Sequence, residues 1–582
     1  MFRKVLEDSK REVSGKNAKE YVSEIIKFHR IQVTEGYNKA ASLCKKIFEE
    51  NGIETEILEY DSDGKKMYLG FLSPEGWSIK KGILRIDDKE YANFEKESIS
   101  VIQRSIPFKG EVDLIYAEKE EDFKKGYLVF THDFKKGKDF ARNYGCLGIV
   151  TDENRSKFDA PDSLQYLSFW GEKLFGFVIS PREGEKLEKE LKKGKKKTYV
   201  EIESSFFPSK MKIVSAKIEG EKDEEIILIS HLCHPKPGGN DNASGVGLSL
   251  EIARVLKKFK KPKRGIRILL VPEVHGTAAF ISENRNFLCG LNLDMVGENQ
   301  FLCNSPLLIE KTPDATPFFG NYLLQEILEE VKKEVSNFQN TFKYPLFMSS
   351  VTPFSGGSDH WILSDPTVGI PTSMLIHWPD KFYHTSFDTI DKVDEKELKR
   401  VGVIATTYLY FIANMGKKEA EWLARLVTQR AKQRILESSD IDYTVEIEKK
   451  NLDSIKRIEN IDVENLKKEI EDLSNFEKKN IKVKEKKIKK GIIPKRKFIG
   501  PISLSKTLLE MPLNEKKKFT EKMEKYKDFK GTLELAVFWA DGNRNIYEIS
   551  KNVKNEIGKV NTDFLIWYFE FLEKHDLIDI ER

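Results

Sequence analysis

Residues 224–256, EEIILISHLCHPKPGGNDNASGVGLSLEIARVL, decide the fold that we expect for this chain. They open with an apolar run at 226–229, which is too short for a helix and is typical of a strand buried on both faces. Prolines and glycines at 235–239 require a loop before a helix begins. The loop region carries two imidazoles, a thiol and a carboxylate, at His231, His234, Cys233 and Asp241. Because open α/β sheets place ligand sites at this end of their strands, the stretch predicts half of a metal site.

The same alternation of strands and helices extends on both sides of this stretch. We expect further strands at 54–60, 266–271, 290–293 and 372–376, and helices at 18–28, 37–51, 245–259, 322–335 and 395–415. Ser14 is a candidate N-cap for the first of these helices. The pattern predicts an α/β domain with a mixed, mainly parallel sheet flanked by helices.

Two other regions of the chain have different patterns. Short β-type runs dominate residues 76–208, which predicts an inserted β-rich domain; it has no cluster of His, Asp and Glu, so we expect a lid or substrate-access role. Residues 419–500 are highly charged and predict a helical connector. Residues 501–582 predict a winged-helix-like domain, because their last fifty residues hold three helical segments and a final short strand at 577–580, the element order of a winged helix. The remaining segments, 1–75 and 209–418, would form the main α/β domain.

Further candidate metal ligands follow other apolar runs of the main domain. They are Glu273, Asp294 and His384. Because the carboxyl ends of parallel strands meet at one edge of a sheet, we expect these side chains to converge with those of the opening stretch. Imidazoles and carboxylates without thiolate clusters are typical of a catalytic Zn²⁺ site holding one or two ions, with Co²⁺ or Mn²⁺ as alternatives. Such a centre activates water and polarises a carbonyl group.

Three motifs resemble the co-catalytic zinc aminopeptidases of the M28 family: NDNASGVG at 240–247, LDMVG at 293–297 and YHTSFDT at 383–389. The similarity is closest to the aminopeptidase-like branch that has a CHP motif, here at 233–235, and a C-terminal winged helix. The inserted domain resembles the protease-associated (PA) domain, through segments such as KGYLVF at 125–130. The resemblance implies that Asp241 bridges two metals, that Asp294 binds one of them and that His384 binds the other.

Two positions differ from the family pattern. The usual His-x-Asp motif reads His231-Leu-Cys here, and His234 follows it. Either histidine could therefore be the metal ligand. His231 could instead orient a ligand by hydrogen bonding, without contacting the metal itself. The family's Glu-Glu pair, a general base followed by a ligand, reads Glu273-Val274. Either Glu273 is the base and His275 or a water fills the ligand position, or Glu273 is a ligand and the base lies elsewhere. A single metal or a weakened second site is therefore an alternative.

Other polar residues near these motifs have both a structural and a functional interpretation. Asp359 and His360 lie on a glycine loop that could line the substrate pocket. Asp388 is expected to fix the loop of His384. Cys233 is more typical of a small buried residue than of a ligand. Asp241 could cap the helix that follows it, although its neighbours favour metal binding.

Composition limits the remaining possibilities. The chain has 582 residues, with 39% hydrophobic and 33% charged residues, which is typical of a soluble protein of more than one domain. Its five cysteines are scattered without a CxxC pair, so we expect no disulfide framework and a cytoplasmic location. The N-terminal segment has no apolar signal sequence, and no stretch is long enough to span a membrane.

The C-terminal region could suggest nucleic-acid binding, because basic residues are dense at 482–497. However, the helix expected at 563–573 carries acidic and apolar side chains and no Arg or Lys, whereas readout of a nucleic-acid groove needs basic and amide groups. The net charge of the chain is only +4. We therefore expect this region to dock on the main domain or on a second subunit, in which case the protein could be a homo-oligomer.

The sequence thus favours a zinc-dependent aminopeptidase acting on peptides, with Glu273 as the catalytic residue. The alternative is a metal-binding but catalytically silent scaffold whose winged-helix tail recruits a protein or nucleic-acid partner, because the second glutamate of the family pair is missing.

Overall fold

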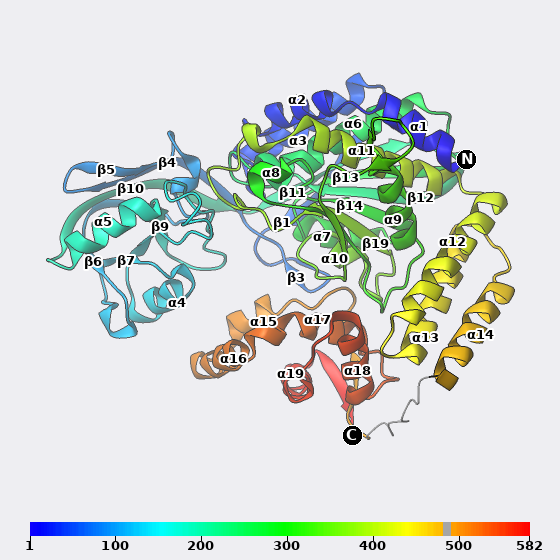
Figure 1. Cartoon of the computed structure of the whole chain (residues 1–582). Helices are drawn as coiled ribbons and strands as arrows, with labels where there is room; N and C mark the ends of the chain where they lie inside the picture. The colour runs from blue at the N-terminus through cyan, green and yellow to red at the C-terminus, as the bar shows by residue number, and fades with distance from the viewer. Residues whose placement is uncertain (481–489) are drawn as a thin grey trace.

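The computed structural model of the chain describes residues 1–480 and 490–582 and is shown in Figure 1. An eight-stranded sheet forms its centre. In spatial order its strands are β1 (Glu54–Ser62), β11 (Ser209–Ile218), β13 (Arg264–Val271), β12 (Lys222–His231), β14 (Phe287–Leu293), β19 (Thr372–His377), β15 (Leu307–Glu310) and β18 (Ser349–Thr352). The sheet is mixed and is covered by helices, so the predicted α/β fold class is confirmed.

The four strands that carry candidate ligands are parallel neighbours: β13, β12, β14 and β19. His231 at the end of β12 lies opposite Val271 at the end of β13, and Leu293 of β14 pairs with Leu375 of β19. The carboxyl ends of all four strands therefore share one edge of the sheet. The antiparallel pairings are confined to β1, β11 and β13 on one side and to β15 with β19 on the other.

The apolar run of β12 is buried on both faces, as the sequence predicts. Ile226 and Leu228 belong to the larger core cluster, whereas Ile227 and Ile229 belong to the cluster on the opposite face. The helices of the larger cluster are α1 (Phe2–Glu12), α2 (Gly15–Ile25), α3 (Glu35–Glu50), α6 (Gly245–Lys258), α9 (Gly320–Val331) and α11 (Glu395–Asn414). The opposite face is covered by α7 (His275–Glu283) and α10 (His360–Leu363).

The start of the chain shows one agreement and one difference. Ser14 caps α2 by accepting a hydrogen bond from the backbone N–H of Asn17, as expected. Helix α1 was not predicted, because its sequence is mostly charged and buries only Val5, Leu6 and Ser9. Helix α1 packs against α11.

The inserted region forms its own seven-stranded sheet, with the spatial order β5-β4-β10-β6-β7-β8-β9. Its strands are β4 (Gly76–Ile86), β5 (Lys89–Asn93), β6 (Phe108–Tyr116), β7 (Leu128–Thr131), β8 (Gly148–Thr151), β9 (Phe175–Val178) and β10 (Lys196–Phe207). Two helices, α4 (Phe134–Tyr144) and α5 (Pro181–Leu191), pack with it. The insert has its own apolar core and stands beside the main sheet (Figure 1).

Three helices follow the main domain where the sequence predicts a connector: α12 (Lys417–Leu436), α13 (Ile441–Asp453) and α14 (Glu464–Asn480). Their buried residues, such as Leu423, Leu452 and Ile470, join the core of the main domain. The part of the basic patch at 482–489 lies outside the described residues. The strand β20 (Ile493–Arg496) pairs antiparallel with β21 (Ile578–Glu581), so the end of this region belongs structurally with the C-terminal domain.

The C-terminal domain is mainly helical. Its helices are α15 (Ser505–Glu510), α16 (Leu513–Lys525), α17 (Lys530–Phe538), α18 (Ile546–Ile557) and α19 (Thr562–Lys574). In α19 the apolar residues Phe564, Tyr568 and Leu572 are buried in the core of this domain.

The remaining short elements are β2 (Met67–Tyr68), β3 (Phe71–Leu72), β16 (Val335–Ser336), β17 (Lys343–Tyr344) and α8 (Gln300–Cys303). Within 1–480 and 490–582, no helix has the length and apolar character needed to cross a bilayer.

Candidate metal centre

The residues predicted as metal ligands meet at the carboxyl edge of the parallel strands. His231 ends β12, and Asp294 follows β14 directly. Glu273 lies two residues beyond β13, and His384 lies in the loop after β19. Asp241 occupies the turn before α6. They form two groups of three donors, and within each group the ligand atoms lie within 4.8 Å of one another.

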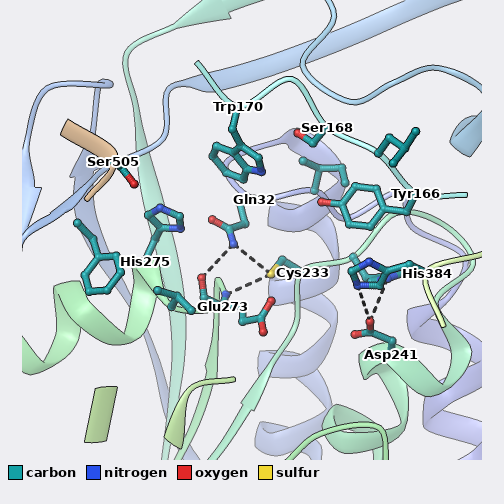
Figure 2. Close-up of a pocket in the computed structure, with 15 residues that line it drawn as sticks. Gln32, Tyr166, Ser168, Trp170, Cys233, Asp241, Glu273, His275, His384 and Ser505 are labelled. Atoms are coloured by element: carbon teal, nitrogen blue, oxygen red, sulfur yellow. Dashed lines mark hydrogen bonds and ion pairs between the residues drawn. The ribbon is translucent and has the colours of Figure 1, made fainter. Parts of the chain in front are cut away.

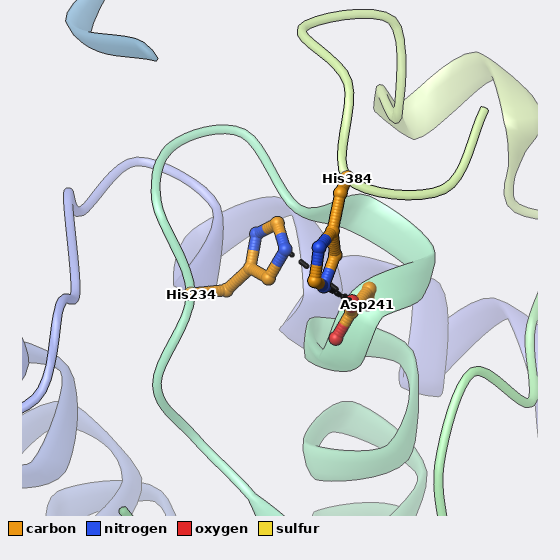
Figure 3. Close-up of side chains that lie close together, drawn as sticks. All are labelled: His234, Asp241 and His384. Atoms are coloured by element: carbon orange, nitrogen blue, oxygen red, sulfur yellow. Dashed lines mark ion pairs between the residues drawn. The ribbon is translucent and has the colours of Figure 1, made fainter. Parts of the chain in front are cut away.

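The first group comprises His234, Asp241 and His384 (Figure 3). Oδ2 of Asp241 lies 3.3 Å from Nε2 of His234 and 3.1 Å from Nε2 of His384. Nδ1 of His234 lies 2.9 Å from the carbonyl oxygen of Pro235, which makes it the protonated nitrogen and leaves Nε2 with a free lone pair. Nε2 of His234 is buried and has no hydrogen-bond partner among the described residues. An imidazole prepared in this way fits a metal ligand.

The loop before Asp241 is shaped around His234. Gly238 has a φ of +55°, and a Cβ atom on it would lie 2.2 Å from Nδ1 of His234. Only glycine fits there, because the backbone is left-handed and the imidazole fills the space of a side chain. The Pro-Gly sequence of this loop therefore serves the position of the histidine.

The second group comprises His231, Glu273 and Asp294. Nε2 of His231 lies 3.2 Å from Oδ1 of Asp294 and 3.3 Å from Oδ1 of Asp241. Its Nδ1 lies 3.1 Å from the carbonyl oxygen of Cys233, so Nδ1 carries the proton and the lone pair of Nε2 is free to bind a metal. Asp241 thus directs one oxygen to each group. The two histidines, between which the sequence does not decide, lie in different groups.

The pKa values reflect how closely these groups are packed. Burial opposes ionisation of Asp241, but the surrounding histidines hold its pKa well below the ordinary value. Burial raises the pKa of Glu273 to about 8, and the carboxylates of Asp294 and Asp359 act in the same direction. Burial likewise raises the pKa of the Cys233 thiol, which is then neutral near pH 7. No Lys or Arg forms a salt bridge with the carboxylates of the two groups, within the part of the chain that the structure describes.

The turn that carries Glu273 is held from behind. Val274 has a φ of +61°, which is strained for a β-branched residue. Oδ1 of Asp359 accepts hydrogen bonds from the N–H of Val274, at 2.8 Å, and from the hydroxyl of Thr277, at 2.6 Å. The N–H of Glu273 points to Sγ of Cys233, at 3.2 Å. These bonds fix the Glu273 carboxylate toward the metal groups.

The structure places Asp359 and His360 beneath the site and not in the wall of its cavity. Both are fully buried. His360 lies 2.8 Å from Oε1 of Glu310 through its Nε2. Asp388 is also buried, and its two oxygens accept the N–H groups of Asn240, at 2.7 Å, and Asp241, at 3.0 Å. Asp388 therefore fixes the loop that carries Asp241, and it lies in the same chain segment as His384.

The insert contributes to the site through one loop. The N–H of Tyr166 donates to the carbonyl of His384 at 2.6 Å. Two further bonds join Leu164 and Ser386, through backbone N–H to carbonyl at 2.9 Å and backbone N–H to side-chain hydroxyl at 3.0 Å. The ring of Tyr166 packs 5.5 Å from that of His234 and 5.0 Å from that of His384, measured between centroids.

A cavity of about 490 Å³ opens over the two groups. Figure 2 shows that its wall combines the main domain, at Gln32 and His275, with the insert, at Tyr166 and Trp170, and with Ser505 of the C-terminal domain. Four of these wall residues were not predicted from the sequence: Gln32, Tyr166, Trp170 and Ser505. No spacing or motif connects them to the ligands, because only the packing of three domains brings them together.

Residues 213–409 match the family described as Peptidase family M28. The match confirms the resemblance suggested by the three sequence motifs, and residues 213–409, called the M28 domain below, carry the candidate metal centre at the carboxyl edge of their sheet.

Particular relatives extend this result. A protein of Clostridium acetobutylicum named "Putative polysaccharide biosynthesis protein with aminopeptidase-like domain" is 25% identical over 372 residues, which are 63% of this chain and 71% of that protein. A crystal structure described as a "putative peptidase" from Clostridium acetobutylicum aligns with 100% of this chain and 99% of its own, with a TM-score of 0.52 and 18% identity. The zinc aminopeptidase BSAP of Bacillus subtilis aligns with 68% of this chain and 95% of its own, with a TM-score of 0.52 and 18% identity. The two structures establish similarity of fold.

Proposed function

We propose that the protein is a metal-dependent aminopeptidase that removes N-terminal residues from peptides. One observation carries the proposal: Asp241 lies between two groups of metal donors and directs an oxygen to a histidine of each, and Glu273 of the second group lines the same cavity as Asp241. Membership of the M28 domain in a peptidase family supports the reaction class.

The donor set suits zinc, since each group combines imidazole and carboxylate ligands; Co²⁺ or Mn²⁺ are also compatible. In this proposal His234, Asp241 and His384 hold one ion, and His231, Asp241 and Asp294 hold the other. Bound zinc would lower the pKa of a water molecule and polarise the scissile carbonyl group.

Glu273 then serves as the general base. Because His234 supplies the third donor of the first group, that group does not require the second glutamate of the family pair. The Glu273 carboxylate takes a proton from the attacking water and delivers it to the leaving amine. Apolar side chains of the cavity wall, including Ile31, Phe71 and Leu167, suit an apolar N-terminal residue of the substrate.

The test uses the full chain loaded with Zn²⁺ or Co²⁺ and a panel of peptides, with release of amino acids followed by mass spectrometry. Peptides with a free N-terminus should be shortened, N-acetylated versions should not, and a chelator should stop the reaction until metal is returned. Metal binding without hydrolysis of any peptide in the panel would instead support the silent scaffold.

The domain assignment completes the proposal. Residues 1–75 and 209–418 form the catalytic domain, 76–208 a PA-like insert, 419–500 a helical connector and 501–582 a winged-helix-like domain, to which the strand β20 at the end of the connector is joined by its pairing with β21. The separate sheet of the insert and the C-terminal helices with β21 support this division. We place the protein in the cytoplasm, with peptides as its substrates.

A further inference from the structure

A second cavity, of about 970 Å³, adjoins the first and shares Trp170, His275 and Ser505 with it. The insert forms one wall, and the C-terminal domain forms another through Leu508 and Leu509 of α15. A substrate whose N-terminal residue occupies the first cavity would extend its remaining residues into the second.

Arg104, on the insert side of this second cavity, is a buried cation without an acidic partner. The residue is only 4% exposed, and its side chain forms no salt bridge with any described carboxylate. Its Nη1 donates to the carbonyl of Glu75 at 2.9 Å, and its Nη2 donates to the carbonyl of Gln32 at 3.3 Å. Nε has no partner among the described residues. Burial lowers the pKa of Arg104 to about 10, so the guanidinium remains charged at neutral pH.

An aromatic side chain connects this cation to the catalytic cavity. The guanidinium carbon of Arg104 lies 4.4 Å from the centre of the Trp170 ring. Trp170 in turn stacks on His275, with ring centroids 5.4 Å apart and an interplanar angle of 19°. Trp170 and His275 line both cavities. They therefore lie between the charge of Arg104 and the first cavity, which Glu273 lines.

A second arginine of the same cavity, Arg142, differs from Arg104 because it has acidic partners. Arg142 pairs with Glu172 and, at 2.7 Å, with Asp139, so its charge is neutralised within the protein. Lys173 and Lys516 add further positive charge to the cavity wall. The wall also contains two glutamates: Glu172 is paired with Arg142, and Glu75 is exposed and interacts with Arg104 without forming a salt bridge. The unbalanced charge of Arg104 therefore calls for an anion from outside the chain.

We propose that Arg104 and Trp170 form a subsite for a carboxylate of the substrate, located beyond the bond that is cleaved. A guanidinium binds a carboxylate through planar, charge-assisted hydrogen bonds, and the indole ring holds the guanidinium in place. The inference rests on the proposed aminopeptidase function and adds a substrate class to it: short peptides with a free C-terminal carboxylate.

The first test compares Leu-Gly-Gly with its C-terminal amide on the zinc-loaded protein. Because hydrogen bonds to charged groups are among the stronger ones, kcat/KM for the acid should exceed that for the amide by about tenfold or more, mainly through KM. Equal values for the two peptides would overturn the subsite, and this comparison needs no variant.

Variants then assign the effect to one residue. R104M should bring the acid-to-amide ratio to about one, and R104K should restore part of the preference because it keeps the charge. R142M is the matched control, since it removes a neutralised arginine from the same cavity, and its acid-to-amide ratio should stay that of the wild type. Thermal unfolding confirms that each variant is folded. A preference that survives in folded R104M contradicts the assignment.

A binding measurement separates this inference from the proposed function. Calorimetry on the zinc-loaded protein compares N-acetyl-Gly-Gly, its amide and glucuronate. Tighter binding of the peptide acid, lost in R104M, supports the subsite even if no peptide is hydrolysed. Hydrolysis without any preference for the acid in binding leaves the enzyme function standing and overturns the subsite. Stronger binding of glucuronate than of the peptide acid overturns the assignment to peptides and indicates a sugar acid.

Discussion

The metal centre and the contact between the M28 domain and the helices that follow it both bury carboxylates, but they neutralise them differently. At the candidate centre, Asp241 and Asp294 face the imidazoles of His231 and His234 and form no salt bridge with a Lys or Arg among the described residues. At the domain contact, Arg434 of α12 binds Asp314 at 2.9 Å and Glu448 at 2.7 Å. A fixed cation thus stabilises the contact.

This difference shows how the two regions can be distinguished without a ligand. Carboxylates that converge on a small volume with lone pairs directed inward repel one another unless a cation enters. Carboxylates that each meet an arginine or a hydroxyl, as Asp314 also meets Tyr443 at 2.9 Å, are complete without one. Substitutions in the first region should therefore change metal content and activity, and those in the second should change stability.

The largest effect is expected for Asp241→Ala. Asp241 supplies an oxygen to both donor groups, so its loss should empty both metal sites. Activity should fall by at least about a thousandfold, since even the hydrogen-bond partners of metal ligands contribute roughly 10- to 100-fold. Metal content is measured by mass spectrometry beside kcat. The control is Asp391→Ala, a nearby aspartate with a side chain 65% exposed, and retention of two metals in D241A would contradict the shared-ligand geometry.

Glu273→Gln should separate the base from the ligands. As a general base, Glu273 should contribute about 10²- to 10⁴-fold to kcat while the metal content stays that of the wild type. His231→Ala is the comparison, because it should lower the metal content. A loss of one metal in E273Q would show that Glu273 is a ligand and that the base lies elsewhere.

At the domain contact, Arg434→Met should destabilise the fold with full metal content. It leaves Asp314 and Glu448 buried without their cation, which should cost about 3–5 kcal/mol in the free energy of unfolding. Guanidinium denaturation monitored by tryptophan fluorescence provides the measurement. Arg582→Met, which removes an exposed pair with Glu573, should change the free energy by about 0–1 kcal/mol. Similar values for the two variants would show that Arg434 stabilises the fold no more than an exposed ion pair does.

The last prediction is a pH dependence of stability where the C-terminal domain meets the M28 domain, through Glu534 beside Trp361 and Glu556 beside Asp314. Burial raises the pKa of both Glu534 and Glu556 to about 8, whereas a glutamate in an unfolded chain has a pKa near its ordinary value of 4.5. Between these values the folded state binds more protons than the unfolded state. Stability is therefore greatest at the acidic end and falls as the pH rises toward 8, by about 1.4 kcal/mol per pH unit for each titrating group. Thermal unfolding from pH 5.5 to 8 should show this slope, and Glu556→Gln should reduce it; an unchanged slope in E556Q would exclude Glu556 as its source.

The main sheet and the ligand edge were predictable from the sequence because they rest on local patterns. A short apolar run such as 226–229, followed by a Pro- and Gly-rich loop, predicts a buried strand, and parallel strands bring their carboxyl ends together. The position of His231 and His234 in different donor groups was not predictable, because it depends on the path of the loop around Gly238. The cavity wall at Trp170 and Ser505 depends on contacts between domains that no local pattern encodes.

The bonds between Tyr166 and the loop of His384 have a consequence for the whole molecule. A metal bound by His384 would restrain the loop that the insert contacts, so metal binding and docking of the insert would be energetically coupled. By linkage, the factor by which metal binding would strengthen docking of the insert equals the factor by which docking of the insert would strengthen metal binding. The concentration of zinc would then determine how firmly the insert is held at the cavity wall, in addition to the fraction of molecules that contain metal.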